Sequence, residues 1–249
     1  MKFRNTVAIA ALTAAATAAI PAAAHASSAA DPADAVAKQF GTGRGVKLSE
    51  TSTITFGSEI ISYRVKGAFG FGKSGIAAAD VTRVPTVDGK TGDRFHFRVV
   101  GGVTYAYGGV WGDEWTKVNQ KYKPQEFSEQ NIDVFERATL RKLLTTATKH
   151  APGGKVGGVR TTAYSGTADF GAMHAVSPAF RAEFGKLTAK ERKTRITWRL
   201  WVDGKGLPRR LTTSWKRGPS DDFPMDTGSA VTTNYDAWGS KVTVASPLE

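Results

Sequence analysis

The 249-residue chain contains no cysteine and has a formal net charge of +12, from 34 Lys and Arg against 22 Asp and Glu. The lack of cysteine excludes disulfides and a lipid anchor on a thiol, so stability must come from the core. The positive charge favours anionic partners such as a membrane or wall surface, although the basic residues are scattered and equally serve solubility. We do not expect nucleic acid as a partner, and we expect a monomer.

The first 26 residues have the features of a secretory signal peptide. Lys2 and Arg4 precede an Ala-rich apolar run, and residues 24–26 (Ala-His-Ala) form an A-x-A cleavage site. Cleavage there would leave 223 residues with a charge of +10. Residues 27–249 contain neither the roughly 20 apolar residues that a membrane span needs nor a Pro/Ser-rich linker. We therefore expect a secreted protein that is not membrane-anchored and folds as one domain.

The predicted domain begins with a short helix and a strand. Asp31-Pro32 supplies an N-cap and a first helical residue. Further on, GAFGFGKSG at residues 67–75 has the spacing of a phosphate-binding P-loop, but it continues an alternating pattern that starts at Ile61, and no helix pattern follows it. We interpret the match as chance in a glycine-rich strand, in which Gly67 and Gly70 mark a twist or bulge.

A hairpin and two helices are expected next. Residues 94–100 and 103–111 alternate and are joined by Gly101-Gly102, which predicts the hairpin. Apolar residues at helical spacing predict a helix over residues 133–150. Residues 177–187 predict a shorter helix with a serine cap.

The C-terminal third returns to strands. Residues 196–202 and 207–215 alternate on either side of the turn DGKG, and AVTTNYDAW and KVTVASP add two more strands. Because the chain shows no strand–helix–strand rhythm, the sheet should be antiparallel and the fold class α+β.

Three stretches carry a family resemblance: VGGVRTTAYSGTADF, ITWRLWVDGKGLPRRLTTSW and TNYDAWGSKVTVASP. In their order and spacing the chain resembles the LppX/LprG-like and LolA-like lipoprotein carriers of bacterial envelopes, over most of residues 40–249. The resemblance implies a strongly curved antiparallel sheet, a half-open barrel, that wraps a few helices around an apolar cavity for acyl chains. Many members are anchored through a lipidated cysteine, which is absent here, so a freely diffusing carrier is expected.

The expected ligand contacts are the apolar side chains of the strands and two arginines that could hold an anionic head group. An ordinary filled core and a solvated outer face are the alternatives for these two sets. The expected contacts are Tyr63, Val65, Phe69, Phe71, Phe95, Phe97, Tyr105, Trp198, Leu200, Arg209 and Arg210.

Catalytic and metal-binding patterns are weak. His96 sits on a polar strand face, His150 at the expected C-terminal end of a helix and His174 in a loop, and none has metal-ligand spacing. The adjacent acids of WGDEW at residues 113–114 suit a turn better than an acid/base pair. The acidic stretch 221–226 lacks the spacing of a calcium-binding loop. We expect no enzyme, no cofactor and no metal.

The sequence therefore favours a secreted, non-catalytic carrier that holds the acyl chains of a lipid or lipid-modified ligand in an apolar cavity. The alternative is a basic, envelope-associated binding module for anionic polymers or partner proteins, with a filled core. A hydrolase that uses Asp113 and Glu114 is a third hypothesis with little support.

Overall fold

The computed structural model describes residues 30–219 and 224–248, so the predicted signal peptide lies outside the described part. The strands are β1 Arg44–Phe56, β2 Glu59–Gly72, β3 Gly75–Val87, β4 Lys90–Thr91, β5 Phe95–Val100, β6 Val103–Tyr107, β7 Thr116–Val118, β8 Ala147–Val156, β9 Val159–Asp169, β10 Arg195–Asp203, β11 Pro208–Arg217 and β12 Thr227–Lys241. The α-helices are α1 Pro32–Ala37, α2 Arg137–Thr145, α3 Phe170–Val176 and α4 Pro178–Phe184, and 3-10 turns cover Gly109–Trp111, Pro124–Phe127 and Glu191–Lys193.

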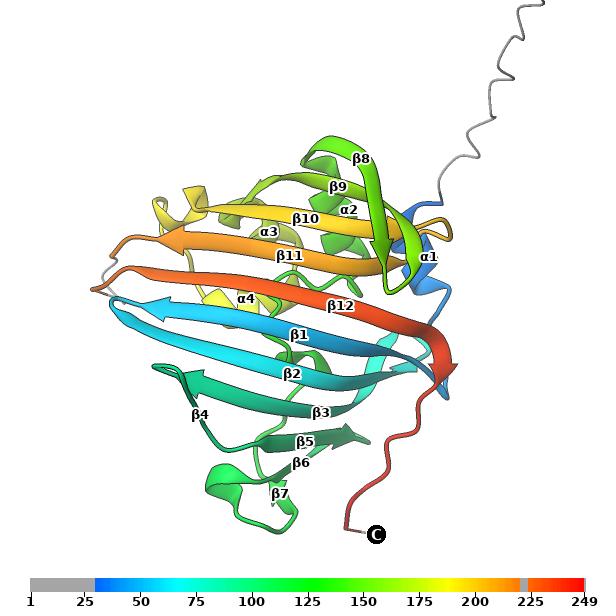
Figure 1. The fold of residues 1–249 in the computed structure, drawn as a ribbon, viewed down its shortest axis with the longest axis vertical. Coiled ribbons are helices and arrows are strands. Elements are labelled where there is room, and N and C mark those ends of the chain that lie inside the picture. Colours follow the sequence, from blue (N-terminus) through cyan, green and yellow to red (C-terminus); the bar gives the residue numbers. More distant parts are fainter. Residues whose placement is uncertain (1–29, 220–223, 249) are drawn as a thin grey trace, which may run out of the picture.

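All the strands belong to one antiparallel sheet, with the order β7-β6-β5-β3-β2-β1-β12-β11-β10-β9-β8 and β4 paired beside β3. The pairing of β1 with β12 joins the N-terminal and C-terminal halves of the chain in the middle of the sheet. The helices lie behind the sheet in the view of Figure 1, all on one face. The predicted α+β class and antiparallel sheet are confirmed.

The sheet is curved and does not close. Register shifts interrupt the ladders between Gly45 and Lys47, between Gly70 and Phe71, and between Trp201 and Val202. Two more lie in β8. An extra residue on one strand bends it and increases its twist, so these positions curl the sheet around its helix-covered face. We call this the concave face and the opposite one the convex face.

The P-loop match lies within a hairpin. Gly67 to Gly72 end β2, and Lys73-Ser74 makes the turn into β3. The predicted bulge is present at Gly70, and at Gly67 a Cβ atom would stand only 2.1 Å from the backbone oxygen of Asp80. Glycine is needed here for the close approach of two strands, as expected for a strand and not for a nucleotide site.

The predicted helix caps at Asp31 and Ser177 are confirmed, and the helix expected between them is shorter at both ends. The Asp31 side chain accepts a hydrogen bond from Ala33 N at α1, and Ser177 caps α4 through Phe180 N. The helix expected over 133–150 spans only Arg137–Thr145, because the chain turns at Thr146 and pairs with β9 as β8. His150 is therefore an exposed strand residue and not a helix terminus. Every helix of the described residues is too short to cross a membrane.

Two further expectations at the element level are corrected. His174 lies in α3 and not in a loop. AVTTNYDAW belongs to the single long strand β12, which ends at Lys241, so KVTVASP forms no further strand. This last segment instead crosses beside the sheet, where the Ser246 hydroxyl hydrogen-bonds the Tyr105 hydroxyl at 3.3 Å.

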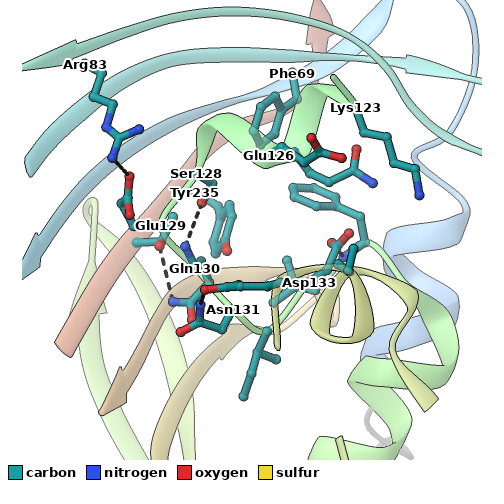
Figure 2. Close-up of a pocket in the computed structure, with 18 residues that line it drawn as sticks. Phe69, Arg83, Lys123, Glu126, Ser128, Glu129, Gln130, Asn131, Asp133 and Tyr235 are labelled. Carbon is teal, nitrogen blue, oxygen red and sulfur yellow. Dashed lines mark hydrogen bonds and ion pairs between the residues drawn. The ribbon is translucent and has the colours of Figure 1, made fainter. Parts of the chain in front are cut away.

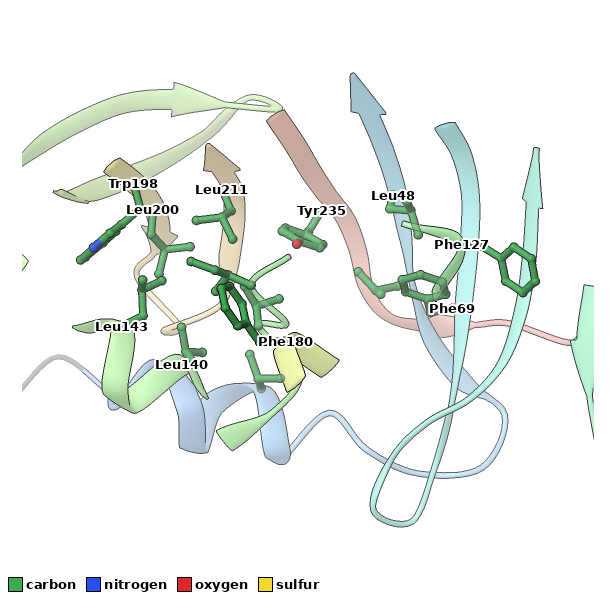
Figure 3. Close-up of a cluster of buried hydrophobic side chains, with 14 of the residues drawn as sticks. Leu48, Phe69, Phe127, Leu140, Leu143, Phe180, Trp198, Leu200, Leu211 and Tyr235 are labelled. Atoms are coloured by element: carbon green, nitrogen blue, oxygen red, sulfur yellow. The ribbon is translucent and has the colours of Figure 1, made fainter. Parts of the chain in front are cut away.

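One hydrophobic cluster beneath the concave face forms the core, and its two parts have different covers (Figure 3). Under β10 and β11, Trp198, Leu200 and Leu211 pack against helices α2 and α4. Under β1 to β5, the cover is residues 119–136, which enter the core through Phe127. The core under β1 to β5 is thus covered by a segment that is mostly irregular. It contains one 3-10 turn, and the next α-helix begins at Arg137.

Replacing Gly67 by alanine tests whether the β2–β3 approach requires glycine. The added Cβ would meet backbone that has no flexible end to move aside, so we expect Gly67→Ala to lower the free energy of unfolding by about 2 kcal/mol. At Gly204 no atom lies within 4 Å of the Cβ position, and the control Gly204→Ala should change stability by less than about 0.5 kcal/mol. Urea denaturation measures both, and equal stability of the two variants would contradict the assignment.

Candidate functional site

A cavity of about 370 Å³ lies between the concave face and the segment that covers it. The sheet contributes Phe69 from β2 and Tyr235 from β12 (Figure 2). Ala179 and Ala182 of α4 also line the cavity. Residues 123–135 supply most of the remaining wall. The cavity is therefore bounded by strands from both halves of the chain, and it exists because the covering segment does not fill the whole concave face.

Glu50 fastens the covering segment to the sheet. This side chain is buried on β1 and accepts hydrogen bonds from Ser128 Oγ, Glu129 N and Thr233 Oγ1, each at 2.7 Å. Burial raises the pKa of its carboxyl, while these three donors favour the charged form. One carboxylate thus joins the segment to both β1 and β12.

Gln130 and Asn131 continue the same attachment toward β11. Gln130 Oε1 accepts a hydrogen bond from Thr213 Oγ1 at 2.8 Å, and Asn131 Oδ1 accepts one from Trp215 Nε1 at 3.1 Å. Asn131 Nδ2 donates to Glu183 Oε1 on α4 at 2.5 Å. Buried polar groups require such partners, and here they lie on β11 and α4, which defines the position of the segment.

Acidic side chains line the covered side of the pocket. Burial is the main cause that raises the pKa of Glu129 to about 7, against the attraction of Arg83, with which it forms an ion pair. Burial also raises the pKa of Asp133 to about 7, although Phe135 N donates to its Oδ1 at 2.8 Å. Arg83 stacks its guanidinium 3.8 Å from the centre of the Tyr63 ring. Near neutral pH both carboxyls therefore exchange protons, so the charge of the pocket varies with pH.

Among the described residues that line the cavity, the charged side chains are Arg83, Lys123 and several acids, with no histidine among them. Among residues 30–219 and 224–248, no three His, Asp or Glu side chains are arranged to hold a metal ion. Asp113 and Glu114 are exposed between the 3-10 turn at Gly109–Trp111 and β7, as the predicted turn requires. Of the acidic stretch 221–226, residues 221–223 lie outside the described part.

The sequence-predicted ligand contacts separate into several groups. Phe69 lines the cavity, and Tyr63 packs against Arg83, which also lines it. Val65 and Phe71 are buried on the same strand, and Phe71 packs among rings that include Phe135 at 6.0 Å. These four residues of β2 remain candidates for ligand contact.

The other apolar candidates lie away from the cavity wall. Phe95 and Phe97 stack on each other at 6.4 Å, and Phe97 stacks on Phe127 at 4.5 Å. Tyr105 is paired with Arg98 and so faces the convex side. Trp198 and Leu200 are buried under α2, where Trp198 Nε1 donates to Thr146 Oγ1 at 3.0 Å.

The two arginines have partners within the protein. Arg209 forms an ion pair with the buried Asp203 at 2.7 Å, which holds the β10–β11 turn. Arg210 donates to Asn234 Oδ1 at 2.7 Å and lies 5.5 Å from the Trp201 ring, on the convex face. Neither arginine lines the cavity.

Sequence reasoning missed the polar half of the site. Glu50 shares the inward face of β1 with Leu48 and Ser52. An acid at such a core position is a signal in the sequence that could have indicated a polar site. Glu129 and Asp133 lie in a segment with no periodic pattern. Their burial follows from the path of the chain across the sheet, for which the sequence carries no local signal.

Comparisons with known proteins return weak structural likenesses. No family model and no curated protein matches the chain. The complex of MucA and MucB from Pseudomonas aeruginosa is similar at TM-score 0.30 and 12% identity, over 84% of this chain and 59% of that one. The chain therefore spans about three fifths of the length of that match.

Two other solved structures give similar values. A putative outer membrane lipoprotein-sorting protein domain from Vibrio parahaemolyticus has TM-score 0.29 and 8% identity, covering 83% of this chain and 89% of its own. A LolA superfamily protein from Nitrosomonas europaea has TM-score 0.26 and 6% identity, covering 85% and 93%. With TM-scores this low, what the pocket binds has to be inferred from its own residues.

The raised pKa of Asp133 predicts a pH dependence of stability. Its folded-state pKa of about 7 exceeds the ordinary 3.8. The contribution of Asp133 to the free energy of unfolding is therefore complete below about pH 4 and is lost as the pH rises through about 7. We expect Asp133→Asn, which keeps the acceptor for Phe135 N, to flatten this decline and to be more stable than the parent by about 1–3 kcal/mol at about pH 8. Urea denaturation across this range measures it. The exposed Asp113→Asn is the control, and an unchanged slope for Asp133→Asn would contradict the assignment.

Proposed function

We propose that the protein is a secreted, non-catalytic carrier that holds the apolar part of a lipid or lipid-modified ligand in the cavity of the concave face. The observation that carries this proposal is the construction of the cavity. Its floor is formed by side chains of a curved sheet, and its cover is a segment attached by hydrogen bonds. A cover of this kind leaves room for a guest between itself and the sheet.

The size and lining of the cavity suit part of an amphipathic ligand. About 370 Å³ lies near the lower end of the roughly 300–1,000 Å³ of small-molecule sites. Phe69, Ile132, Val134 and Tyr235 supply apolar contact. Each methylene transferred from water contributes about 0.8 kcal/mol, so one acyl segment gives useful affinity without a reactive residue.

The acids of the pocket restrict how such a ligand enters. An anionic head group placed beside Glu129 and Asp133 would be repelled whenever these carboxyls are charged. The head group therefore stays outside with water, and the hydrocarbon end enters. Proton uptake by the two carboxyls would make the pocket less polar, so acyl binding should strengthen as the pH falls through about 7.

Two experiments test the proposal. The natively produced protein should release about one equivalent of lipid when extracted with organic solvent and measured by mass spectrometry. In the second, Ala182→Trp fills the cavity from α4, and we expect the affinity for a fluorescent long-chain acyl lipid to fall about tenfold or more, since the indole displaces several methylenes.

Ala175→Trp is the matched control, because Ala175 is exposed on α3 and does not line the cavity. Its affinity for the acyl lipid should remain that of the parent protein. Absence of extractable lipid together with equal acyl binding by the two tryptophan variants would reject the carrier function.

A further inference from the structure

The convex face of the sheet, which is turned toward the viewer in Figure 1, carries two adjacent rows of basic and polar side chains. Strand pairing aligns residues of neighbouring strands about 4.8 Å apart. The first row runs from Lys149 on β8 through Arg199 on β10 to Arg64 on β2, and every position between these cations is Ser or Thr. The second runs from Trp201 on β10 through Arg210, Asn234 and Ser49 to Lys66 on β2. We call them the basic rows.

The cations of the basic rows are accessible to a partner. Lys149, Arg199, Arg64 and Lys66 are exposed, and Arg210 is half-buried. Within the described part of the chain, none of these five lies at ion-pair distance from an acid. Neither row contains an acid. Their positive charge is therefore not neutralised by the protein and attracts anionic partners.

Two of the cations are held in position by an aromatic ring. The guanidinium carbon of Arg199 lies 4.6 Å from the centre of the Trp201 ring, and that of Arg210 lies 5.5 Å from it. Arg210 Nε also donates to Asn234 Oδ1 at 2.7 Å. A guanidinium carries five N–H donors, so most donors of both arginines remain for a ligand. Because the ring restricts the side chains beforehand, less conformational entropy is lost on binding.

Toward the Arg44 end of β1, the acids near the basic rows have basic neighbours. The relevant pairs are the ion pairs of Asp80 with Arg98 and of Asp203 with Arg209, and Asp236 opposite Lys47 in the strand pairing. The row that contains Lys47, Asp80 and Arg98 therefore has no excess of negative charge. An anionic ligand on the basic rows is not repelled from this side.

Toward the Phe56 end of β1, a neutral row through Thr53 and Thr197 separates the basic rows from the next acid. That acid is Asp169, which lies 3.9 Å from Arg195. The remaining acids near this face are Asp221 and Asp222, which follow β11 beyond Arg217 in the sequence, and Asp113 and Glu114, which follow β6. The path from β8 to β2 is thus free of acids.

From this arrangement we infer that the convex face binds a linear polysaccharide that carries carboxylate groups, along the basic rows. The carboxylates meet the five cations, and arginine binds a carboxylate through two parallel hydrogen bonds. The sugar hydroxyls exchange hydrogen bonds with the Ser, Thr and Asn side chains between the cations, since these groups both donate and accept. From β8 to β2 the path crosses six strand spacings, about 29 Å.

Other classes of polyanion use these features less fully. A nucleic-acid single strand stacks its bases on open aromatic rings, whereas the Trp201 ring has two guanidinium groups against it. A rigid duplex would touch a convex surface only along a narrow line. An acidic polypeptide would satisfy the cations and leave the hydroxyls between them without a specific role. A flexible chain of acidic sugars uses both the charges and the hydroxyls.

This inference goes beyond the proposed function, because the basic rows and the cavity lie on opposite faces of the sheet. The test measures the fluorescence anisotropy of labelled polygalacturonate fragments, with dextran as the uncharged polymer. We expect binding of polygalacturonate that weakens as salt is added, and no binding of dextran. Affinity should rise with fragment length until the fragment spans about 29 Å, the length of the rows, and then level off.

A variant without three of the cations tests the location of the site. Arg199→Gln, Arg64→Gln and Lys66→Gln together should lower the affinity for polygalacturonate about tenfold or more, since charge-assisted hydrogen bonds are lost. The matched control removes the same charge through Lys38→Gln, Lys121→Gln and Lys186→Gln. These lysines are exposed and lie beside α1, in the covering segment and after α4. The affinity of the control should stay within about twofold of the parent.

Thr51→Val tests whether the ligand is a sugar. It keeps the charge and the β-branched shape of an exposed residue in the first row and removes its hydroxyl. We expect severalfold weaker binding of polygalacturonate and unchanged binding of polyglutamate. Thr55→Val is the control on the same strand, outside the rows, and should leave polygalacturonate binding unchanged.

Three outcomes would overturn the inference. The first is absence of polygalacturonate binding at low salt. The second is equal loss of binding in the two triple variants, which would indicate a diffuse charge effect. The third is binding of polyglutamate or single-stranded DNA as tight as that of polygalacturonate together with no effect of Thr51→Val, which would identify another polyanion. Acyl-lipid binding in the cavity should be unchanged in all these variants, so its failure would reject the carrier function alone.

Discussion

The concave face of the sheet must be kept from water, and the helices are too few and too short to cover it. Helices α2, α3 and α4 shield the strands β9 to β11, but the region under β1 to β5 is closed by residues 119–136. Polar backbone buried without regular structure needs other partners. Glu50 provides them, and an apolar residue in its place would leave Ser128 Oγ and Glu129 N unpaired at about 1–3 kcal/mol each. The rest of the site depends on this attachment.

The same constraint explains why the pocket has two kinds of wall. Strand residues alternate, so the sheet side presents the apolar set to which Phe69 and Tyr235 belong. The covering segment cannot alternate, and it brings the side chains of Glu129 and Asp133 inward. The pocket thus combines apolar side chains with the acids Glu129 and Asp133 and the basic side chains of Arg83 and Lys123.

Several strands, the antiparallel class of the sheet and two helix caps could be predicted because each has a local cause. Alternation with period two marks β2, β5, β6, β10 and β11, and Asp31 and Ser177 are side chains that cap a helix directly. The end of α2 could not be predicted, since Ala147 to His150 fit a helix locally and pair with β9 through long-range contacts. The burial of Glu129 and Asp133 could not be predicted for the same reason, because it also depends on contacts between distant parts of the chain.

Charge is separated across the sheet. Glu50, Glu129 and Asp133 lie on the concave side, where burial raises their pKa values. The convex face instead presents Arg199 and Arg210 beside the Trp201 ring, and Lys216. Because acids are drawn inward, the outside is more positive than the net charge of the chain suggests.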